Sequence, residues 1–163
     1  EAFHLFPVKH EQIEILVHPE SIIHGMVYYK DGSVLAQMGS PDMRTPIAHA
    51  LAWPERMSAP APRIDFTLLK SLNFEEPDEM RFPALTLGRQ VLKAGGTAPA
   101  TMNAANEVAV ARFLKKEIPF TAIVTIVQGT LARFPARPVN DISDILDADE
   151  KARYFAESYP CTF

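Results

Sequence analysis

Two histidines are the first side chains of this sequence that could do chemistry. His18 and His24 stand at the two ends of a short stretch that could bring both imidazoles to the end of one strand. No two of the five histidines have the i, i+4 spacing of a helical zinc motif, and the single cysteine cannot complete a structural zinc site. Because hydrogen-bonded structural histidines are commoner than ligands, we predict that no residue of this chain holds a metal.

The loop from Gly39 to Pro46 is a second candidate. Two prolines pre-set its backbone, and the soft apolar side chain of Met43 stands between Asp42 and Arg44. A rigid loop that places a thioether beside charges suits the wall of a pocket for a flat apolar group. The spacing alone favours the alternative, a structural turn in which Asp42 and Arg44 cap neighbouring elements.

A third polar group stands near the start of a predicted helix, where Asn103, Asn106 and Glu107 share one face. The favoured interpretation is that these side chains tie loops to the helical part of the molecule, and the alternative is a binding site. The seven glycines form neither a GxGxxG pattern nor a P-loop, so nothing in this chain cradles a phosphate by itself.

The N-terminal part of the sequence has the pattern of a small sheet. The β-branched content of residues 13–18 predicts a buried strand, and residues 26–30 and 33–38 flank Asp31-Gly32, which predicts a hairpin with a tight two-residue turn. Apolar residues occur at both parities of these strands, so both faces of the sheet are expected to meet protein. Residues 45–53 predict a short helix with Pro46 in its first turn.

The C-terminal part has helical periodicity instead. Helices are expected over residues 83–93, 99–116, 121–134 and 147–159, with Gly95-Gly96 ending the first and Asp147 capping the last through Glu150. A stiff proline-rich connector, Ala59–Pro62, separates the two parts. The prediction is an α+β protein with sheet residues 1–55, connector residues 56–80 and a four-helix bundle over residues 81–163.

Composition limits the possible partners. The 163 residues carry 16 Lys and Arg against 20 Asp and Glu, and the densest basic pair is Lys115-Lys116, so a nucleic-acid partner is not expected. No apolar run reaches the roughly 18 residues of a membrane span. The lone cysteine, Cys161, gives no reason to expect an oxidising compartment, which favours the cytoplasm. The N-terminus, without Met or a leader pattern, looks like a cut through a longer chain.

Five motifs, in order, resemble those of 1-deoxy-D-xylulose 5-phosphate reductoisomerases over essentially the whole chain. They are residues 15–24, 31–37, 41–49, 51–54 and 103–107. The resemblance implies the C-terminal part of that enzyme: the closing strands of the catalytic domain, the connector and a C-terminal four-helix domain. Glu1-Ala2 resembles the end of the family's NKGLE-x-I-E-A segment.

The same resemblance implies an NADPH-dependent isoprenoid-pathway enzyme, of the methylerythritol phosphate route, that forms a homodimer through the sheet and acts on a phosphosugar. NADPH and a divalent metal (Mg, Mn or Co) would be bound by N-terminal segments that precede Glu1. For this chain it implies that His24 supports the active site and that Pro41, Asp42 and Met43 wall the nicotinamide and substrate pocket. The isolated chain is expected to be inactive. The alternative is a non-catalytic dimerisation or scaffold module.

Overall fold

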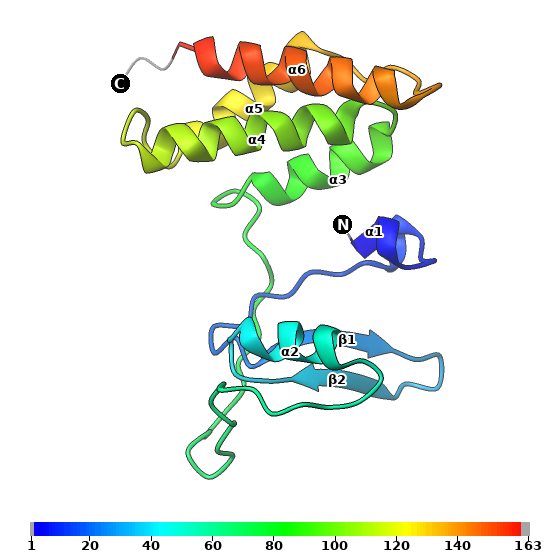
Figure 1. Cartoon of the computed structure of the whole chain (residues 1–163), viewed down its shortest axis with the longest axis vertical. Helices are drawn as coiled ribbons and strands as arrows, with labels where there is room; N and C mark the ends of the chain where they lie inside the picture. Colours follow the sequence, from blue (N-terminus) through cyan, green and yellow to red (C-terminus); the bar gives the residue numbers. More distant parts are fainter. Residues whose placement is uncertain (1, 161–163) are drawn as a thin grey trace. The chain divides into compact units, whose positions relative to one another are not determined.

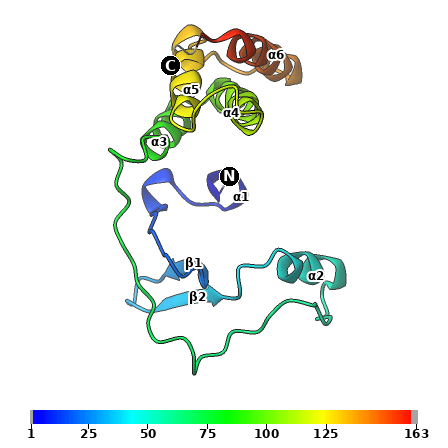
Figure 2. The same ribbon diagram turned by 90° about the vertical axis from the view of Figure 1, so that its left-hand side faces the viewer.

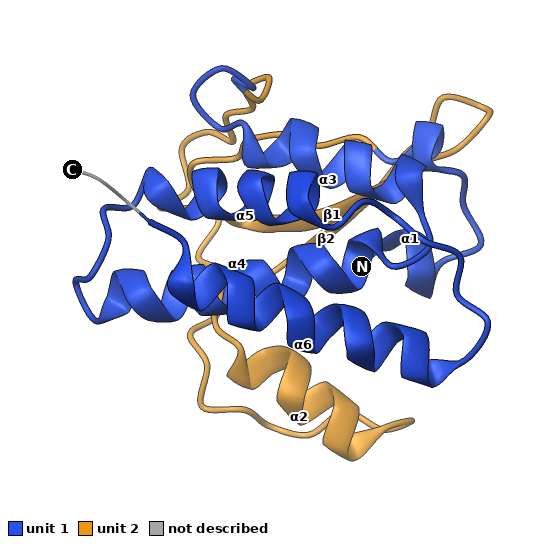
Figure 3. Cartoon of the chain, turned by 90° about the horizontal axis from the view of Figure 1, so that it is seen from above, with its two compact units in different colours: residues 1–13, 78–163 blue, residues 14–77 orange. Residues whose placement is uncertain are grey.

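The computed structural model of this chain describes residues 2–160 and has the expected α+β composition (Figure 1). The chain divides into two compact units, coloured separately in Figure 3. One contains residues 14–77 and the other residues 1–13 with 78–163. This grouping differs from the expected division at residues 55 and 80, because the N-terminal residues cluster with the helices. The expected division stays a proposal about functional domains. Cys161 and Glu1 lie outside the described residues.

The unit of residues 14–77 contains an antiparallel hairpin, as predicted. Strand β1, Ile23–Tyr28, pairs with β2, Val34–Met38, with Val27 opposite Leu35. The turn is longer than predicted. Tyr29 N donates to Ser33 O at 2.9 Å and Gly32 N donates to Tyr29 O at 3.0 Å, so three residues form the loop. Gly32 has φ +88°, the positive value that favours glycine at this point of such a loop.

The prediction of a buried strand over residues 13–18 is wrong. This segment has irregular backbone, and its one ladder contact is an isolated bridge between Val17 and Glu75. Leu16 is 40% exposed, so the segment is not buried either. The composition favours an extended backbone, but a strand also needs a partner along its length, and residues 74–76 supply only one pair.

Helix α2, Arg44–Ala52, lies within one residue of its predicted bounds. Ala48, His49 and Ala52 are its half-buried residues. Met43, Ile47 and Leu51, spaced four residues apart, are all more than half exposed. The hairpin is similarly uncovered, because Tyr28 and Leu35, which lie at opposite parities, are 61% and 64% exposed. In this unit, many large apolar side chains of the hairpin and of α2 are therefore left exposed.

The second unit is helical and is centred on α4. Its elements are α1 (Ala2–Leu5), the 3-10 turn η1 (His10–Gln12), α3 (Ala84–Ala94), α4 (Ala98–Leu114), α5 (Ala122–Arg133) and α6 (Ile142–Ser158). Helix α4 packs against α3, α5 and α6, which Figures 1 and 2 show beside it. Four C-terminal helices were expected and are present, whereas a regular four-helix bundle stays a prediction. Within residues 2–160, no helix combines the length and the apolarity that crossing a membrane would need.

Helix α6 begins five residues earlier than predicted. Asp141, not Asp147, is its cap: the carboxylate of Asp141 accepts from Ser143 N at 2.7 Å, and Asp144 Oδ2 accepts from Asn140 N at 2.8 Å. Asp141 and Asp144 have the same three-residue spacing as Asp147 and Glu150, so the spacing could not separate the two possible starts.

Small residues form the contact between α4 and α6. Ala104, Ala105 and Ala109 of α4 and Ala152 and Ala156 of α6 are completely buried. Because alanine lets helix axes approach closely, these helices pack tightly. The hydrophobic core continues through Leu87, Ile118, Ile126 and Val127. Leu114, at the end of α4, is 72% exposed.

Candidate functional site

His24 lies on β1 and holds its own strand to the neighbouring one. Nε2 donates to the carbonyl oxygen of Ser21 at 3.0 Å, and Nδ1 lies 3.3 Å from Oε1 of Gln37 on β2. The ring also packs under Gly39, where an added Cβ would lie 3.7 Å from Cε1. The imidazole is therefore oriented from two sides, close to the point where β2 leads into the Pro41–Met43 loop.

His18, the other half of the histidine pair, has separate partners. Its Nδ1 lies 2.7 Å from the carbonyl oxygen of Asn73 and 3.1 Å from Oε2 of Glu20, and its ring stacks on Phe74 at 4.8 Å between centroids. Nε2 is buried and has no hydrogen-bond partner among the described residues. His18 and His24 share no partner, so the two imidazoles do not form one site.

Glu20 completes the contacts around His18. Hydrogen bonds from the side chain and then the backbone of Asn73 lower the pKa of Glu20 below its usual value. This cluster joins two segments more than fifty residues apart. Sequence reasoning missed it, because nothing in the sequence marks Asn73 as the partner of His18.

The Pro41–Met43 loop leads into α2 through a pair of opposite charges. Asp42 Oδ1 accepts from the backbone N of Arg44 and from its Nε, both at 2.9 Å, and Oδ2 accepts from Nη2 at 2.5 Å. These bonds lower the pKa of Asp42 to about 2 and raise the pKa of Arg44. The structural turn of the stated alternative is therefore present, although α2 itself has Met43 as its N-cap and no side-chain bond there. Met43, between the two charges, is 71% exposed.

The third polar group connects two helices instead of a loop. Glu107 of α4 accepts from Nη2 of Arg153 on α6 at 2.8 Å and from Nδ2 of Asn103 at 3.0 Å. The bond from Arg153, followed by that from Asn103, lowers the pKa of Glu107. Asn106 is exposed on the same helix. The prediction that these side chains tie a loop to the helices is not confirmed, because the partner of Glu107 is a residue of α6 and Asn103 bonds to Glu107 itself.

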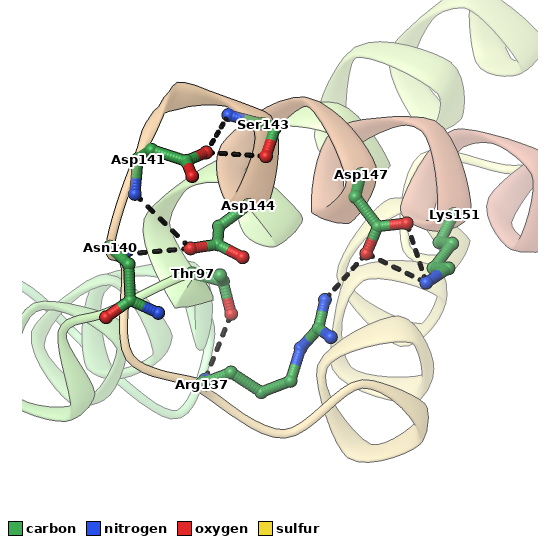
Figure 4. Close-up of polar contacts among 8 residues, drawn as sticks. All are labelled: Thr97, Arg137, Asn140, Asp141, Ser143, Asp144, Asp147 and Lys151. Carbon is green, nitrogen blue, oxygen red and sulfur yellow. Dashed lines mark hydrogen bonds and ion pairs between the residues drawn. The ribbon is translucent and has the colours of Figure 1, made fainter.

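The acidic residues of α6 are also used for structure. As Figure 4 shows, Asp141 bonds to Ser143 in the first turn, Asp144 accepts from the backbone N of Asn140, and Asp147 pairs with Arg137 and Lys151. The same close-up shows Thr97 accepting from the backbone N of Arg137. Within residues 2–160, no group of three or more His, Cys, Asp or Glu side chains could hold a metal ion. Asp141 and Asp144 are thus capping residues, and Asp147 is an ion-pair partner.

Comparison with protein families gives a match to the DXP reductoisomerase C-terminal domain over residues 38–155. The 1-deoxy-D-xylulose 5-phosphate reductoisomerase of Zymomonas mobilis is 56% identical over 153 residues, which are 94% of this chain and 39% of that protein. The enzyme of Rhodospirillum centenum is 54% identical over 156 residues, 96% of this chain and 39% of that protein. The chain thus spans about two fifths of the length of these relatives.

Solved structures give the same result. The Zymomonas mobilis reductoisomerase in complex with NADPH matches with a TM-score of 0.85 at 55% identity, over 95% of this chain and 41% of that one. A DOX-P reductoisomerase in complex with NADPH, fosmidomycin and magnesium matches with a TM-score of 0.86 at 42% identity, over 95% of this chain and 40% of that one.

Proposed function

Because the chain belongs to the 1-deoxy-D-xylulose 5-phosphate reductoisomerase family, we propose that it acts as the C-terminal part of an NADPH- and metal-dependent enzyme of that activity. The enzyme would rearrange the carbon skeleton of 1-deoxy-D-xylulose 5-phosphate and reduce the product to 2-C-methyl-D-erythritol 4-phosphate, a step of isoprenoid biosynthesis. The observation that carries this proposal is the family match over residues 38–155, which contains both the Pro41–Met43 loop and the Asn103–Glu107 motif.

We place the NADPH and metal sites in the part of the enzyme that precedes this chain. The resemblance puts the metal-binding acids and the dinucleotide domain there, and the solved relatives are complexes with NADPH and with magnesium. When bound, the metal polarises the substrate oxygens and the nicotinamide supplies the hydride. The described residues of this chain do not fit as metal ligands, since they form no acidic or histidine cluster.

The chain's own contribution is to shape and support the pocket. Met43 offers an exposed thioether that suits contact with a flat nicotinamide ring, and Pro41 and Asp42 fix the loop that carries it. His24 supports the same region from β1 through its contacts with Ser21 and Gln37. These residues orient and enclose the reactants, and we assign no proton transfer to them.

Two substitutions in the complete enzyme test this assignment. His24→Gln and Met43→Ala are expected to lower kcat/KM by about 10- to 100-fold, the usual cost of removing support around a reactive centre, and to leave metal binding intact. The matched controls are His10→Gln and Met80→Ala, because both residues lie in the other unit, where His10 is partly exposed and Met80 is 93% exposed. Wild-type rates in both test variants would remove the pocket role.

We also propose that the complete enzyme is a homodimer formed through the β1–β2 sheet. Both faces of this sheet expose apolar side chains, which supports a protein contact there. Light scattering at micromolar concentration should return the dimer mass, and a monomer mass would contradict this.

We place the enzyme in the cytoplasm, supported by a sequence whose single cysteine cannot form a disulfide within the chain.

A further inference from the structure

We propose that Asp42 and Arg44 are positioning residues for the reaction: their paired side chains form a clamp that holds Met43 in place against the reactants. The clamp is defined as the carboxylate of Asp42 together with the backbone N–H and guanidinium of Arg44. This inference rests on the pocket role of Met43 proposed above and goes beyond it, because it says what fixes that side chain.

The clamp closes around the backbone of Met43. Asp42 Oδ1 receives two hydrogen bonds from Arg44, one from the backbone and one from Nε, and Oδ2 receives bonds from Nε at 3.0 Å and Nη2 at 2.5 Å. The backbone is held on the same side, since Thr45 N donates to Asp42 O at 3.1 Å. The residues before and after Met43 are therefore joined by side-chain and backbone bonds at once.

Packing within this chain cannot do the same work. Met43 is 71% exposed, and a methionine has three freely rotating side-chain bonds. The residues around it therefore do little to fix the orientation of its side chain. Fixing the backbone on either side limits the direction in which the side chain leaves the loop. An exposed, flexible side chain needs a rigid backbone if it is to contact a reactant at a constant place.

The turn itself does not require an arginine as the second partner of the aspartate. Four other aspartates among the described residues make the same bond to the backbone N two residues later. Asp78 bonds in this way to Met80 N, and its second partner is the backbone N of Arg81. In the other three pairs the second partner is a hydroxyl group. These pairs are Asp31 with Ser33, Asp65 with Thr67 and Asp141 with Ser143. A short hydroxyl side chain is therefore enough for the turn.

A cation at this place is also unfavourable for the helix alone. Arg44 is the first residue of α2, where the positive end of the helix dipole repels a positive charge. The carboxylate of Asp42 offsets that repulsion by its charge, and it also holds the guanidinium in a planar two-point geometry that lysine cannot reproduce. The clamp thus has a cost for the helix and a benefit in rigidity at Met43.

The test uses the complete enzyme with Asp42→Asn, Arg44→Gln and Arg44→Lys. Each is expected to lower kcat/KM by roughly 10- to 100-fold, because misplacement by about 1 Å of a group near the reactants can cost that much. Arg44→Lys keeps the charge and should still resemble Arg44→Gln. The matched control is Asp65→Asn, which neutralises the carboxylate of the same kind of turn elsewhere in the same unit, where no arginine is bound, and should leave kcat/KM unchanged.

A double-mutant cycle separates positioning from general stability. In a Met43→Ala background, Asp42→Asn should cause no further loss of kcat/KM, while its effect on the melting temperature persists. An equal loss of kcat/KM in both backgrounds would overturn the inference, because the clamp would then act independently of Met43. Wild-type kinetics in Asp42→Asn or in Met43→Ala would overturn it as well.

The Met43 methyl signal in NMR spectra of methionine-labelled protein gives a readout apart from activity. It should move or broaden in Asp42→Asn and Arg44→Lys and stay in place in Asp65→Asn. An unmoved signal in both test variants would overturn the inference. If the complete wild-type protein had no reductoisomerase activity, the proposed function would fail, and the methyl signal would still decide whether the clamp holds Met43.

Discussion

The carboxylate of Asp42 accepts bonds from the guanidinium and the backbone of Arg44, and these bonds lower its pKa from the usual 3.8 to about 2. A carboxyl group whose pKa is lower in the folded state stabilises the fold above its unfolded pKa, and the stabilisation is lost as the pH falls through the folded pKa. For Asp42 this loss lies between its usual 3.8 and about 2.

The direction of this pH dependence gives a first prediction at the residue scale. The melting temperature of the wild-type chain should exceed that of Asp42→Asn at neutral pH, and the difference should shrink as the pH falls from about 4 to about 2. Thermal melts of both proteins at a series of pH values measure this difference. A difference that stays constant down to pH about 2 would show that Asp42 titrates as an ordinary aspartate.

Gly129 on α5 supports a second prediction. A Cβ added to this residue would overlap the ring of Tyr159, with its closest contact at Cε2. Tyr159 also packs edge-on against Phe155, so its ring is not free to move away. Gly129→Ala should therefore destabilise the helical unit by about 1 to 3 kcal/mol, the usual cost of overpacking.

Gly88 provides the matched control. It lies within α3, and a Cβ added there would meet nothing within 4 Å. Because glycine inside a helix is less favourable than alanine by roughly 0.5 to 1 kcal/mol, Gly88→Ala should be neutral or stabilising. Chemical denaturation of the two variants compares them directly, and equal midpoints would contradict the packing of Tyr159 over Gly129.

At the scale of elements, the stability of the helical unit depends on which of its apolar side chains are buried. Ile126 is completely buried in the core, whereas Leu114 is 72% exposed. Ile126→Ala should cost about 2 to 5 kcal/mol of unfolding free energy. Leu114→Ala should stay within about 0.5 kcal/mol of the wild type, as is usual for surface positions. A loss from Leu114→Ala as large as that from Ile126→Ala would contradict the described packing.

Elements with local start and stop signals could be predicted from the sequence. Pro83 and Gly95 stand at the two ends of α3, and the predicted bounds of α3, α4 and α5 agree with the structure within two residues. The start of α6 was wrong because two aspartates have equivalent capping patterns. The strand predicted over residues 13–18 was wrong because strand pairing depends on a contact with Glu75, which local composition does not encode.

The same distinction holds for the candidate site. The contact between Asp42 and Arg44 spans two residues, so the sequence already indicated a structural turn that uses both charges. The partners of His18 lie 55 residues away, and no local pattern indicates them. The link from Glu107 to Arg153 is equally non-local, since it depends on the packing of α4 against α6.

At the scale of the whole molecule, the unit of residues 14–77 exposes many large apolar side chains. Large apolar side chains of its hairpin and of α2 are more than half exposed, among them Val27, Tyr28, Leu35, Ile47 and Leu51. Exposed large apolar side chains on both faces of a hairpin favour a contact with further protein. The relatives are about two and a half times as long as the matched part, which is consistent with contacts made to the rest of such an enzyme.

The central claim is that this chain contributes a pocket wall and not a complete active site. The most direct measurement is oxidation of NADPH in the presence of 1-deoxy-D-xylulose 5-phosphate and Mg²⁺, followed by the fall in dihydronicotinamide absorbance. The 163-residue chain is compared with a longer protein that also contains the N-terminal segments of the family. The longer protein should turn over substrate, and the 163-residue chain should not. Turnover by the purified chain alone, or none by the longer protein, would contradict the account.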